Sequence, residues 1–424
     1  MQEEYDFVIF GTGLIESLLA CELSKMQKKV LVVDENANYG SDVMTLSYNE
    51  MVKKFNAEPI KELEEKSREF NIDLIPKIFL VNGAVQSLMK NYSIEELVKF
   101  KLIGGSFLFK SGKLLKIPTS EKSSMKTSLV SFWEKPRLIK FFWNIRKYAE
   151  GKNYDFKETV REEFVRYGIS EQTQEFIGHA IALNLDDKYL DKHPKEFFDK
   201  VVLYVSSIVT SKGVNSPYIF PEYGLSEISQ FLSRVGSVSG ITYRLNTKLD
   251  NLELEENSYK LDITDFEGEK ISLRTKAIIS NPSYFMEDII PKYEIIRSIC
   301  IIKGECDLLQ ENDSANVVFL SSDLKRKNDI FLLVLSEKEK VCPKNYRIAI
   351  ISTKRETSSD PKEEISVVYS KLGNVIQSFV SVDTVYCARE EIPGFYIIEN
   401  IDHTPSLETG FKEFEYILEK ILKL

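Results

Sequence analysis

The sequence predicts a mixed α/β protein with additional β-sheet and an inserted all-helical domain. A strand–helix–strand pattern around a glycine turn opens the chain, amphipathic helices fill its second quarter, and strand-like segments dominate from Tyr243 onward. Such an order of elements is typical of a layered α/β fold carrying an insertion. We expect residues 1–118 and 211–424 to form one discontinuous α/β domain and residues 119–210 to form the helical domain.

The composition agrees with a folded protein of two or three domains. The chain has 424 residues, of which 43% are hydrophobic and 29% are charged. Its formal net charge of −9 argues against nucleic-acid binding and against adhesion to anionic lipid. Five cysteines without CxxC spacing indicate reduced thiols, and three histidines argue against a metal site. An acidic N-terminus, no membrane-length apolar run and no prenylation cysteine predict a soluble cytoplasmic protein.

The first forty residues predict a Rossmann-like domain of the FAD/NAD-binding type. Tyr5–Phe10 is a short apolar strand, and Gly11 and Gly13 form a GxG turn before a helix. The strand Lys29–Val33 then ends at Asp34. Glycines at this position let the backbone approach a pyrophosphate at the helix N-terminus, while the acid meets a ribose.

Glu16 stands where the third glycine or alanine of this fingerprint belongs. A carboxylate in the first helical turn suits the helix dipole but repels a pyrophosphate placed there. We therefore interpret Gly11, Gly13, Glu16 and Asp34 as a vestigial dinucleotide motif and expect no bound FAD or NAD. A flavin-dependent oxidoreductase on the same fold remains the alternative.

The second quarter of the chain predicts successive amphipathic helices. Pro136 and Pro194 suit the first turns of two helices, and Ser170 suits the N-cap of another. Apolar residues recur at helical spacing within 138–148, in Asp155–Tyr167 (Val160, Phe164 and Val165) and within 197–208.

Strands are expected in the remainder, with 276–280 returning to the first sheet. Further strands are expected at 296–306, 314–321, 329–336 and 346–353, and a final helix from Gly410 to Leu424.

Several segments of the chain, in order, resemble the Rab GDP dissociation inhibitors. They are YDFVIFGTGLIESLLACELS, KKVLVVDENANYG, REFNIDLIPKIFLVNGAVQSLM, GGSFLFKSGKLLKIP, FIGHAIAL, SPYIFPEYGLSEISQFLSR and DIFLLVLS. The resemblance implies a protein that is not an enzyme and needs no cofactor. It implies binding of GDP-loaded, prenylated Rab GTPases and their geranylgeranyl lipids, slowed GDP release, and transport through the cytoplasm with transient membrane association. A Rab escort protein is the alternative within the resemblance, although the chain lacks the large insertions of that group.

The resemblance assigns a Rab-binding platform to Tyr39, Glu227 and Arg234, with Thr242 and Arg244 nearby. Glu227 and Arg234 are seven residues apart, so in a helix they share one face. Arg68 matches a basic residue that the family uses toward the Rab, and Arg244 replaces an expected methionine. The alternative is a solvated charge pair with an ordinary surface tyrosine.

Three further predictions concern the lipidated tail of the Rab. We hypothesise that the helical domain holds the lipid, although the same residues could simply form its core. The candidates are Phe141, Phe142, Ile145, Phe176, Ala180, Ile181 and Leu183. A hairpin around Ser111-Gly112 could provide a groove for the tail with Phe107, Phe109 and Leu114. The segment with Tyr218, Phe220 and Tyr223 resembles the mobile loop of the family. Both segments could instead pack between domains.

The sequence offers no catalytic constellation. It contains no GxSxG, Walker A, HExxH or EF-hand pattern. His179 is flanked by apolar residues and is expected to be a hydrogen-bonded core histidine rather than a base.

Overall fold

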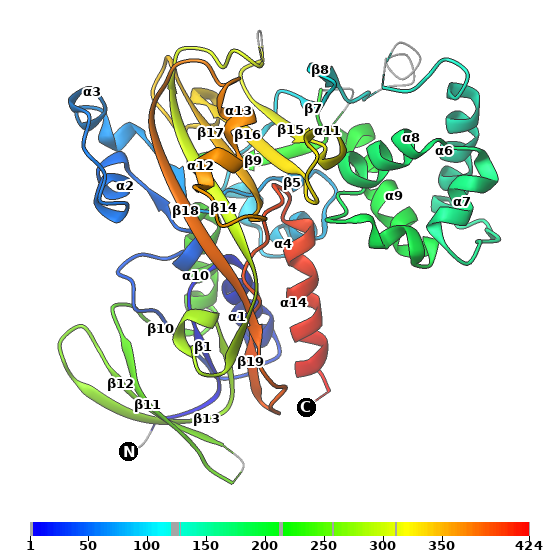
Figure 1. The fold of residues 1–424 in the computed structure, drawn as a ribbon. Helices are drawn as coiled ribbons and strands as arrows, with labels where there is room; N and C mark the ends of the chain where they lie inside the picture. Colours follow the sequence, from blue (N-terminus) through cyan, green and yellow to red (C-terminus); the bar gives the residue numbers. More distant parts are fainter. Residues whose placement is uncertain are drawn as a thin grey trace.

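The first sheet is built around the strand–helix–strand unit that opens the chain (Figure 1). The computed structural model describes residues 3–119, 127, 129–211, 215–256, 258–309 and 312–423. The order of this sheet is β10-β2-β1-β13-β12-β11, and β19 also pairs with β13. Its strands are β1 (Glu3–Phe10), β2 (Val30–Val33), β10 (Thr242–Arg244), β11 (Lys248–Leu254), β12 (Tyr259–Thr264), β13 (Lys270–Ser280) and β19 (Phe395–Ile397).

Parallel pairing confirms the predicted opening of the chain and its return strand. β1 is parallel to β2, with Phe7 opposite Val30, and parallel to β13, with Phe10 opposite Ser280. The predicted return strand is therefore the second half of β13, whose first half pairs antiparallel with β12. Helix α1 (Leu14–Lys25) connects β1 to β2, as the dinucleotide-binding pattern predicts.

The second sheet has the order β18-β14-β17-β16-β15-β7-β8. Its strands are β7 (Ser106–Lys110), β8 (Lys113–Lys116), β14 (Ile289–Lys303), β15 (Ala315–Phe319), β16 (Ile330–Ser336), β17 (Tyr346–Lys354) and β18 (Val375–Ala388). The long antiparallel strands β14 and β18 run side by side and extend down to β19 of the first sheet (Figure 1). The predicted strands fall on the second half of β14 and on β15 to β17, and they omit β18.

Two short sheets join segments that are distant in the sequence. One has the order β5-β9-β6, with β5 (Phe79–Leu80), β6 (Phe100–Leu102) and β9 (Tyr218–Pro221). The other pairs β3 (Thr45–Leu46) with β4 (Ile72–Asp73). Because β9 is the middle strand of its sheet, the chain leaving the helical insertion is fixed against residues that precede the insertion.

Helices cover one face of the first sheet and share an apolar core with it. They are α1, α4 (Ala84–Asn91), α10 (Ser226–Val238) and α14 (Glu408–Ile421). Leu18, Leu232 and Phe414 contribute buried side chains from three of them. This layer places α10 against α1, close to the glycine turn. Short helices elsewhere are α2 (Tyr48–Lys54), α3 (Lys61–Glu64), α11 (Ser321–Leu324), α12 (Pro361–Glu364) and α13 (Ser366–Tyr369).

Residues 129–211, which we call the helical module, lie to one side of the two sheets (Figure 1). The module contains α6 (Lys135–Ala149), α7 (Val160–Tyr167), α8 (Glu171–Glu175), a π-helix (Phe176–Ile181) and α9 (Pro194–Thr210). Thr159 caps α7, since its Oγ1 accepts a hydrogen bond from the Glu162 amide at 3.2 Å. α7 therefore begins later than expected, and Val165 is 70% exposed rather than on the apolar face. Among helices in the described ranges, none is both long and apolar enough to cross a bilayer.

Candidate functional site

Tyr39 lies just beyond the carboxyl end of β2, beside the edge strand β10. β10 runs parallel to β2, with Arg244 opposite Val33. The rings of Tyr39 and Tyr243 meet edge to face, with centroids 5.8 Å apart. Thr242 is exposed next to Tyr243. The structure thus brings Tyr39, Thr242 and Arg244 together at one edge of the first sheet.

Helix α10 carries Glu227 in its first turn and Arg234 two turns later. Its start lies against the Tyr39 loop, because a Cβ built on Gly40 would come within 2.9 Å of Ser226 Oγ. Glu227 is half-buried, and burial raises the pKa of its carboxyl. Arg234 is exposed, and the helical spacing places both side chains on one face. These two residues and the three at the β10 edge form a group that we call the platform.

A buried carboxylate that the sequence analysis missed fixes the start of α10. Asp73, at the end of β4, accepts the Leu225 amide at 3.0 Å and the Thr45 hydroxyl. Gly224 has φ 99°, and a Cβ there would lie 2.5 Å from Asp73 Oδ1. Burial raises the pKa of Asp73 to about 7. The sequence signal for this role is weak: Asp73 is an isolated acid within an apolar segment.

Arg68 and Arg244 differ from the rest of the predicted platform. Arg68 is exposed in the turn Ser67–Glu69, which is held to α2 by a 2.9 Å hydrogen bond from the Asn49 amide. This segment lies near α2 and α3, apart from β10 in Figure 1. Arg244 is half-buried, with a guanidinium nitrogen 3.5 Å from Glu3 Oε1. An internal acid therefore already orients Arg244.

Asp34 closes the glycine turn with hydrogen bonds from its own chain. Its Oδ2 accepts the Thr12 amide at 2.9 Å, the Thr12 hydroxyl at 2.5 Å and the Ser41 hydroxyl at 2.7 Å. Its Oδ1 accepts the Asn36 amide at 2.9 Å. In a dinucleotide site this acid receives ribose hydroxyls. Here donors from the protein itself already bind both carboxylate oxygens of Asp34.

Glu16 fills the space that a pyrophosphate would need. A Cβ on Gly13 would lie 2.5 Å from Glu16 Oε2, and one on Gly11 would lie 3.2 Å from Oε1. The side chain is 3% exposed, and Asn281 Nδ2 donates to Oε1 at 3.4 Å. Burial, reinforced by Asp42, raises the pKa of Glu16 to about 8. The residues at the helix N-terminus therefore do not fit the phosphates of FAD or NAD.

The core of the helical module is aromatic and closed. The Phe141 ring meets those of Phe164, Tyr167 and Phe198 at centroid distances between 5.4 and 5.8 Å. Of the predicted lipid-binding residues, Phe142 is half-buried. The buried ones, all in the same apolar cluster, are Phe141, Ile145, Phe176, Ala180, Ile181 and Leu183. They are core residues in this structure, and their contact with lipid stays a prediction.

A cleft of about 1010 Å³ separates the helical module from α14. Ile181 and Leu183 line it from the module, and Phe411 lines it from α14. An ion pair between Glu196 and Lys412 joins the two sides. The cleft therefore combines apolar walls with charged side chains, next to two of the predicted lipid-binding residues.

The predicted tail groove lies on a hairpin, as expected. Ser111 and Gly112 turn β7 into β8 with φ 48° and 76°, the left-handed pair typical of a two-residue hairpin turn. Phe107 and Phe109 are buried in the core of the second sheet, whereas Leu114 is half-buried. Only Leu114 of the three is open to a peptide in this structure.

The segment that resembles the mobile loop is mostly a strand. Tyr218 and Phe220 are fully buried in β9. Tyr223 follows β9 with φ 71° and is 49% exposed. An ion pair of 3.3 Å between Lys101 and Glu222 lies beside it. Tyr223 is therefore the accessible residue of this predicted set.

His179 contacts two carboxylates and joins the helical module to the second sheet through one of them, Asp329. Its Nδ1 lies 2.6 Å from Asp329 Oδ2, and its Nε2 lies 3.1 Å from Asp187 Oδ1. Burial alone would lower the pKa of His179, but the hydrogen bonds to both acids outweigh it and raise the pKa to about 10. An imidazolium between two acids fits a structural contact rather than a base.

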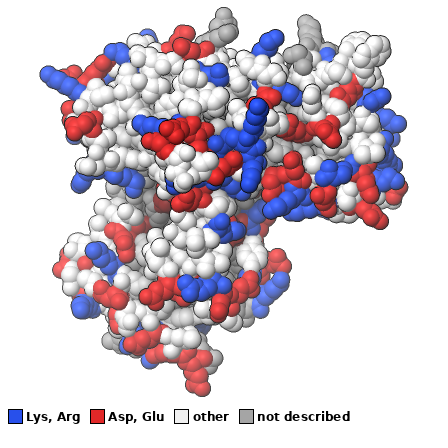
Figure 2. Space-filling view, in the orientation of Figure 1, with Lys and Arg blue, Asp and Glu red and all other residues white. Residues whose placement is uncertain are grey.

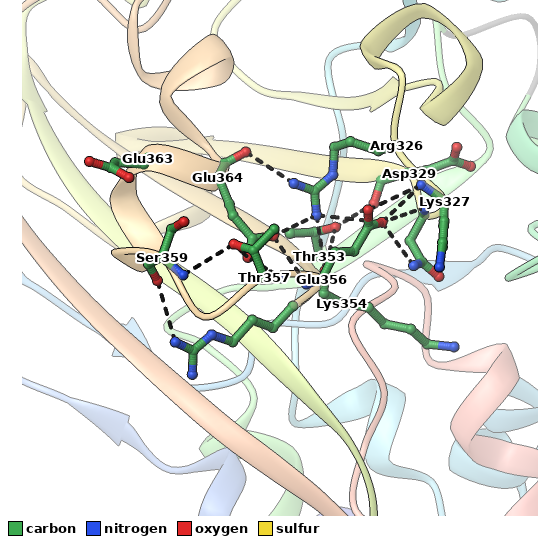
Figure 3. Close-up of polar contacts among 12 residues, drawn as sticks. Arg326, Lys327, Asp329, Thr353, Lys354, Glu356, Thr357, Ser359, Glu363 and Glu364 are labelled. Atoms are coloured by element: carbon green, nitrogen blue, oxygen red, sulfur yellow. Dashed lines mark hydrogen bonds and ion pairs between the residues drawn. The ribbon is translucent and has the colours of Figure 1, made fainter.

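A polar network holds Asp329 in place (Figure 3). The Ser321 amide donates to Asp329 Oδ1 at 2.7 Å, and the Thr353 hydroxyl donates to the Asp329 carbonyl at 2.8 Å. Nearby, Arg326 donates to Glu364 Oε2 at 3.0 Å. The hydrogen bonds from Ser321 and Thr353 hold Asp329 in position for its contact with His179.

Three comparisons with known proteins agree with this geometry. The family model described as GDP dissociation inhibitor matches residues 1–423. A Rab GDP-dissociation inhibitor of Saccharomyces cerevisiae is 34% identical over 404 residues, covering 92% of this chain and 88% of the yeast protein. The crystal structure of a Rab GDI from Plasmodium falciparum has a TM-score of 0.91 at 28% identity, covering 99% of this chain and 98% of that one. An oxidoreductase from Methanosarcina mazei shares the fold, with a TM-score of 0.62 at 14% identity over 97% of this chain and 99% of that one.

The sheet order, the helical module and the closed glycine turn define an α/β protein of dinucleotide-binding architecture whose phosphate position is filled by Glu16. Within that class of proteins, the family model that matches residues 1–423 indicates one family. The chain belongs to the GDP dissociation inhibitor family. The resemblance found in the sequence is thereby confirmed.

Proposed function

We propose that this protein is a Rab GDP dissociation inhibitor that binds GDP-loaded, prenylated Rab GTPases. It slows GDP release, extracts its partners from membranes and returns them through the cytoplasm, by binding and without a catalytic step. The observation that carries the proposal is the gathering of Tyr39, Glu227 and Arg234 on a chain that matches the family from end to end.

The platform makes the protein contact with the Rab. The Arg234 guanidinium and the Glu227 carboxylate share a helical face and can each form a charge-assisted hydrogen bond. Tyr39 supplies rigid aromatic area beside them, supported by the ring of Tyr243. Since Asp73 fixes the start of α10, the platform is preorganised for binding. Arg68 adds a separate contact from the turn beside α2.

Selectivity for GDP follows from differential binding. A platform complementary to the switch surface of the GDP state binds that state more tightly than the GTP state. The selectivity equals the ratio of these two affinities. Holding the GDP conformation closed around its nucleotide slows release.

The helical module holds the lipid. A geranylgeranyl chain has about twenty carbons, and each buried CH₂ contributes roughly 0.8 kcal/mol. The site must therefore offer comparable apolar area. Because the core around Phe141 is closed, the lipid enters when the helices part or when it lies along the cleft beside Ile181 and Leu183.

The C-terminal tail of the Rab connects two anchors, namely the platform and the helical module. The Rab C-terminus runs from the platform to the module past Leu114 and Tyr223, the accessible members of their sets. Tethering makes the second contact intramolecular, so neither anchor needs high affinity alone.

Release of a fluorescent GDP analogue from prenylated Rab tests this function. The protein should slow release, and Arg234→Ala and Tyr39→Val should each weaken that effect at least about tenfold, as expected for contacts at an interface centre. Arg389→Ala, a change of an exposed arginine between β18 and β19, is the matched control and should behave as wild type. Full inhibition by both platform variants would refute the platform.

A further inference from the structure

Both tryptophans of the chain are exposed on the helical module. Trp133 is 84% exposed just before α6, and Trp143 is 54% exposed within it. Phe132 and Ile139 are 75% and 56% exposed beside them. Large apolar side chains that gather in water mark an interaction surface more often than scattered ones do.

Ile139 and Trp143 are one turn apart on the outer side of α6. Phe132 and Trp133 lie in the turn directly before α6. The Glu134 amide closes this turn by donating to the Ser131 carbonyl at 3.1 Å. The Trp133 ring meets Phe132 edge to face at 5.6 Å. The opposite side of α6 is the module core.

Basic side chains surround this apolar stripe. Lys140, Arg146 and Lys147 flank Trp143, and the Lys147 ammonium lies 3.4 Å above its ring. Residues 135–152 hold six basic residues and one acid, Glu150, which pairs with Arg146 at 3.1 Å. Lys and Arg side chains gather along the right-hand edge of Figure 2, where α6 and α7 lie in Figure 1. The net charge of −9 therefore conceals a local basic face.

We propose that the outer face of α6, with residues 132 and 133, binds an anionic membrane surface. A helix with aromatic and aliphatic side chains between lysines and arginines is suited to the lipid interface, where indole rings lie at headgroup depth and cations meet anionic lipids. Charge complementarity selects anionic lipid over neutral lipid. Because the inner face of the same helix belongs to the module core, docking brings that core to the bilayer.

The tryptophans themselves provide the probe. The full chain, without any GTPase, is mixed with vesicles of phosphatidylcholine alone or of phosphatidylcholine with phosphatidylserine. Phosphatidylserine vesicles should shift the tryptophan emission to shorter wavelength and carry the protein into the vesicle pellet. Added salt should reverse both effects, because the attraction between surface charges is screened. An unchanged emission with phosphatidylserine, or an equal response to both vesicles, would overturn the proposal.

Two matched variants separate this face from the charge of the whole protein. Lys140→Glu with Lys147→Glu keeps both tryptophans and should weaken partitioning at least about tenfold, since each basic residue near an anionic surface contributes severalfold. Lys248→Glu with Lys270→Glu makes the same change in net charge on exposed residues of β11 and β13 and should bind as wild type. Equal losses in both variants would also overturn the proposal.

The test does not depend on the proposed Rab function. Vesicle binding needs no GTPase, and release of GDP from Rab in detergent needs no vesicle. A protein that binds vesicles but leaves GDP release unchanged would refute only the Rab function. A protein that slows release but ignores phosphatidylserine would refute only the membrane face.

Discussion

The glycine turn has the sequence pattern of a dinucleotide site that we expect to be vestigial, whereas the helical module is predicted to bind lipid, and the two regions differ in what fills them. At the glycine turn, the buried Glu16 carboxyl fills the phosphate position, and donors from Thr12 and Ser41 take up the Asp34 carboxylate that would meet a ribose. In the module, aromatic rings around Phe141 fill the interior mainly through packing, with a hydroxyl pair of Tyr154 and Tyr167 at its margin.

This difference in filling determines which of the two regions opens more easily for a ligand. A buried polar network is costly to break, because each separated donor or acceptor loses its partner. An apolar core loses only packing, and an apolar guest such as a prenyl chain restores it. The glycine turn thus serves as a structural element, whereas under the proposed function the module exchanges ring–ring contacts for ring–lipid contacts.

The largest expected effect tests the packing of the module. Phe141→Ala should lower the free energy of unfolding by roughly 3–5 kcal/mol, because it removes a fully buried ring. Chemical denaturation followed by circular dichroism measures the change. Phe266→Ala, at a ring that is 72% exposed, should change stability by less than about 0.5 kcal/mol. Equal costs at both sites would contradict the closed core.

The next effect tests the polar network at the glycine turn. Asp34→Asn removes the charge that accepts from Thr12 and Ser41, and should cost about 2–3 kcal/mol. The same denaturation assay measures it. A variant as stable as wild type would mean that these hydrogen bonds contribute nothing to the closure.

Glu16 supplies a pH-dependent test. Its folded pKa of about 8 lies above the ordinary value of 4.5, so the folded state retains the proton over this range more strongly than the unfolded state. The contribution of Glu16 to stability is present below about pH 4.5 and is lost as pH rises toward 8. Glu16→Gln should therefore be more stable than wild type at pH 8, by on the order of 2 kcal/mol, with little gain at pH 5. A difference that does not change with pH would contradict burial of the ionisable carboxyl.

The smallest effect on stability concerns the platform. Arg234→Ala alters an exposed side chain and should change the free energy of unfolding by less than about 0.5 kcal/mol, even while it weakens Rab binding. Denaturation of the variant measured beside the GDP-release assay checks both. A loss of stability above about 1 kcal/mol would show that Arg234 supports the fold rather than a partner.

Much of the fold could be predicted because it depends on local pattern. The strand–helix–strand start, the return strand and the helices opened by Pro136 and Pro194 follow from apolar periodicity and turn residues. Strand β18 was missed, although it is rich in valine. Val165 lies on the exposed face rather than the apolar one, because Val160 and Phe164 are one helical turn apart whereas Val165 is a further residue round the helix.

The site was harder to predict because its supports come from distant parts of the chain. Tyr39 and Arg234 could be named from the family resemblance, but Asp73 and Asp329 could not. Asp73 meets Leu225, and Asp329 meets His179, each about 150 residues away in sequence. No local sequence pattern predicts such a contact. The role of Glu16 could be predicted because this residue lies within the glycine motif that it blocks.

Extraction from membranes gives the sharpest test of whether the protein binds prenylated Rab selectively in its GDP state. Prenylated Rab is loaded with GDP or GTP on vesicles, and the full-length protein is added. We expect soluble Rab only in the GDP sample, with extraction reduced at least about tenfold by Arg234→Ala. Equal extraction of both nucleotide forms, or none of either, would contradict the account.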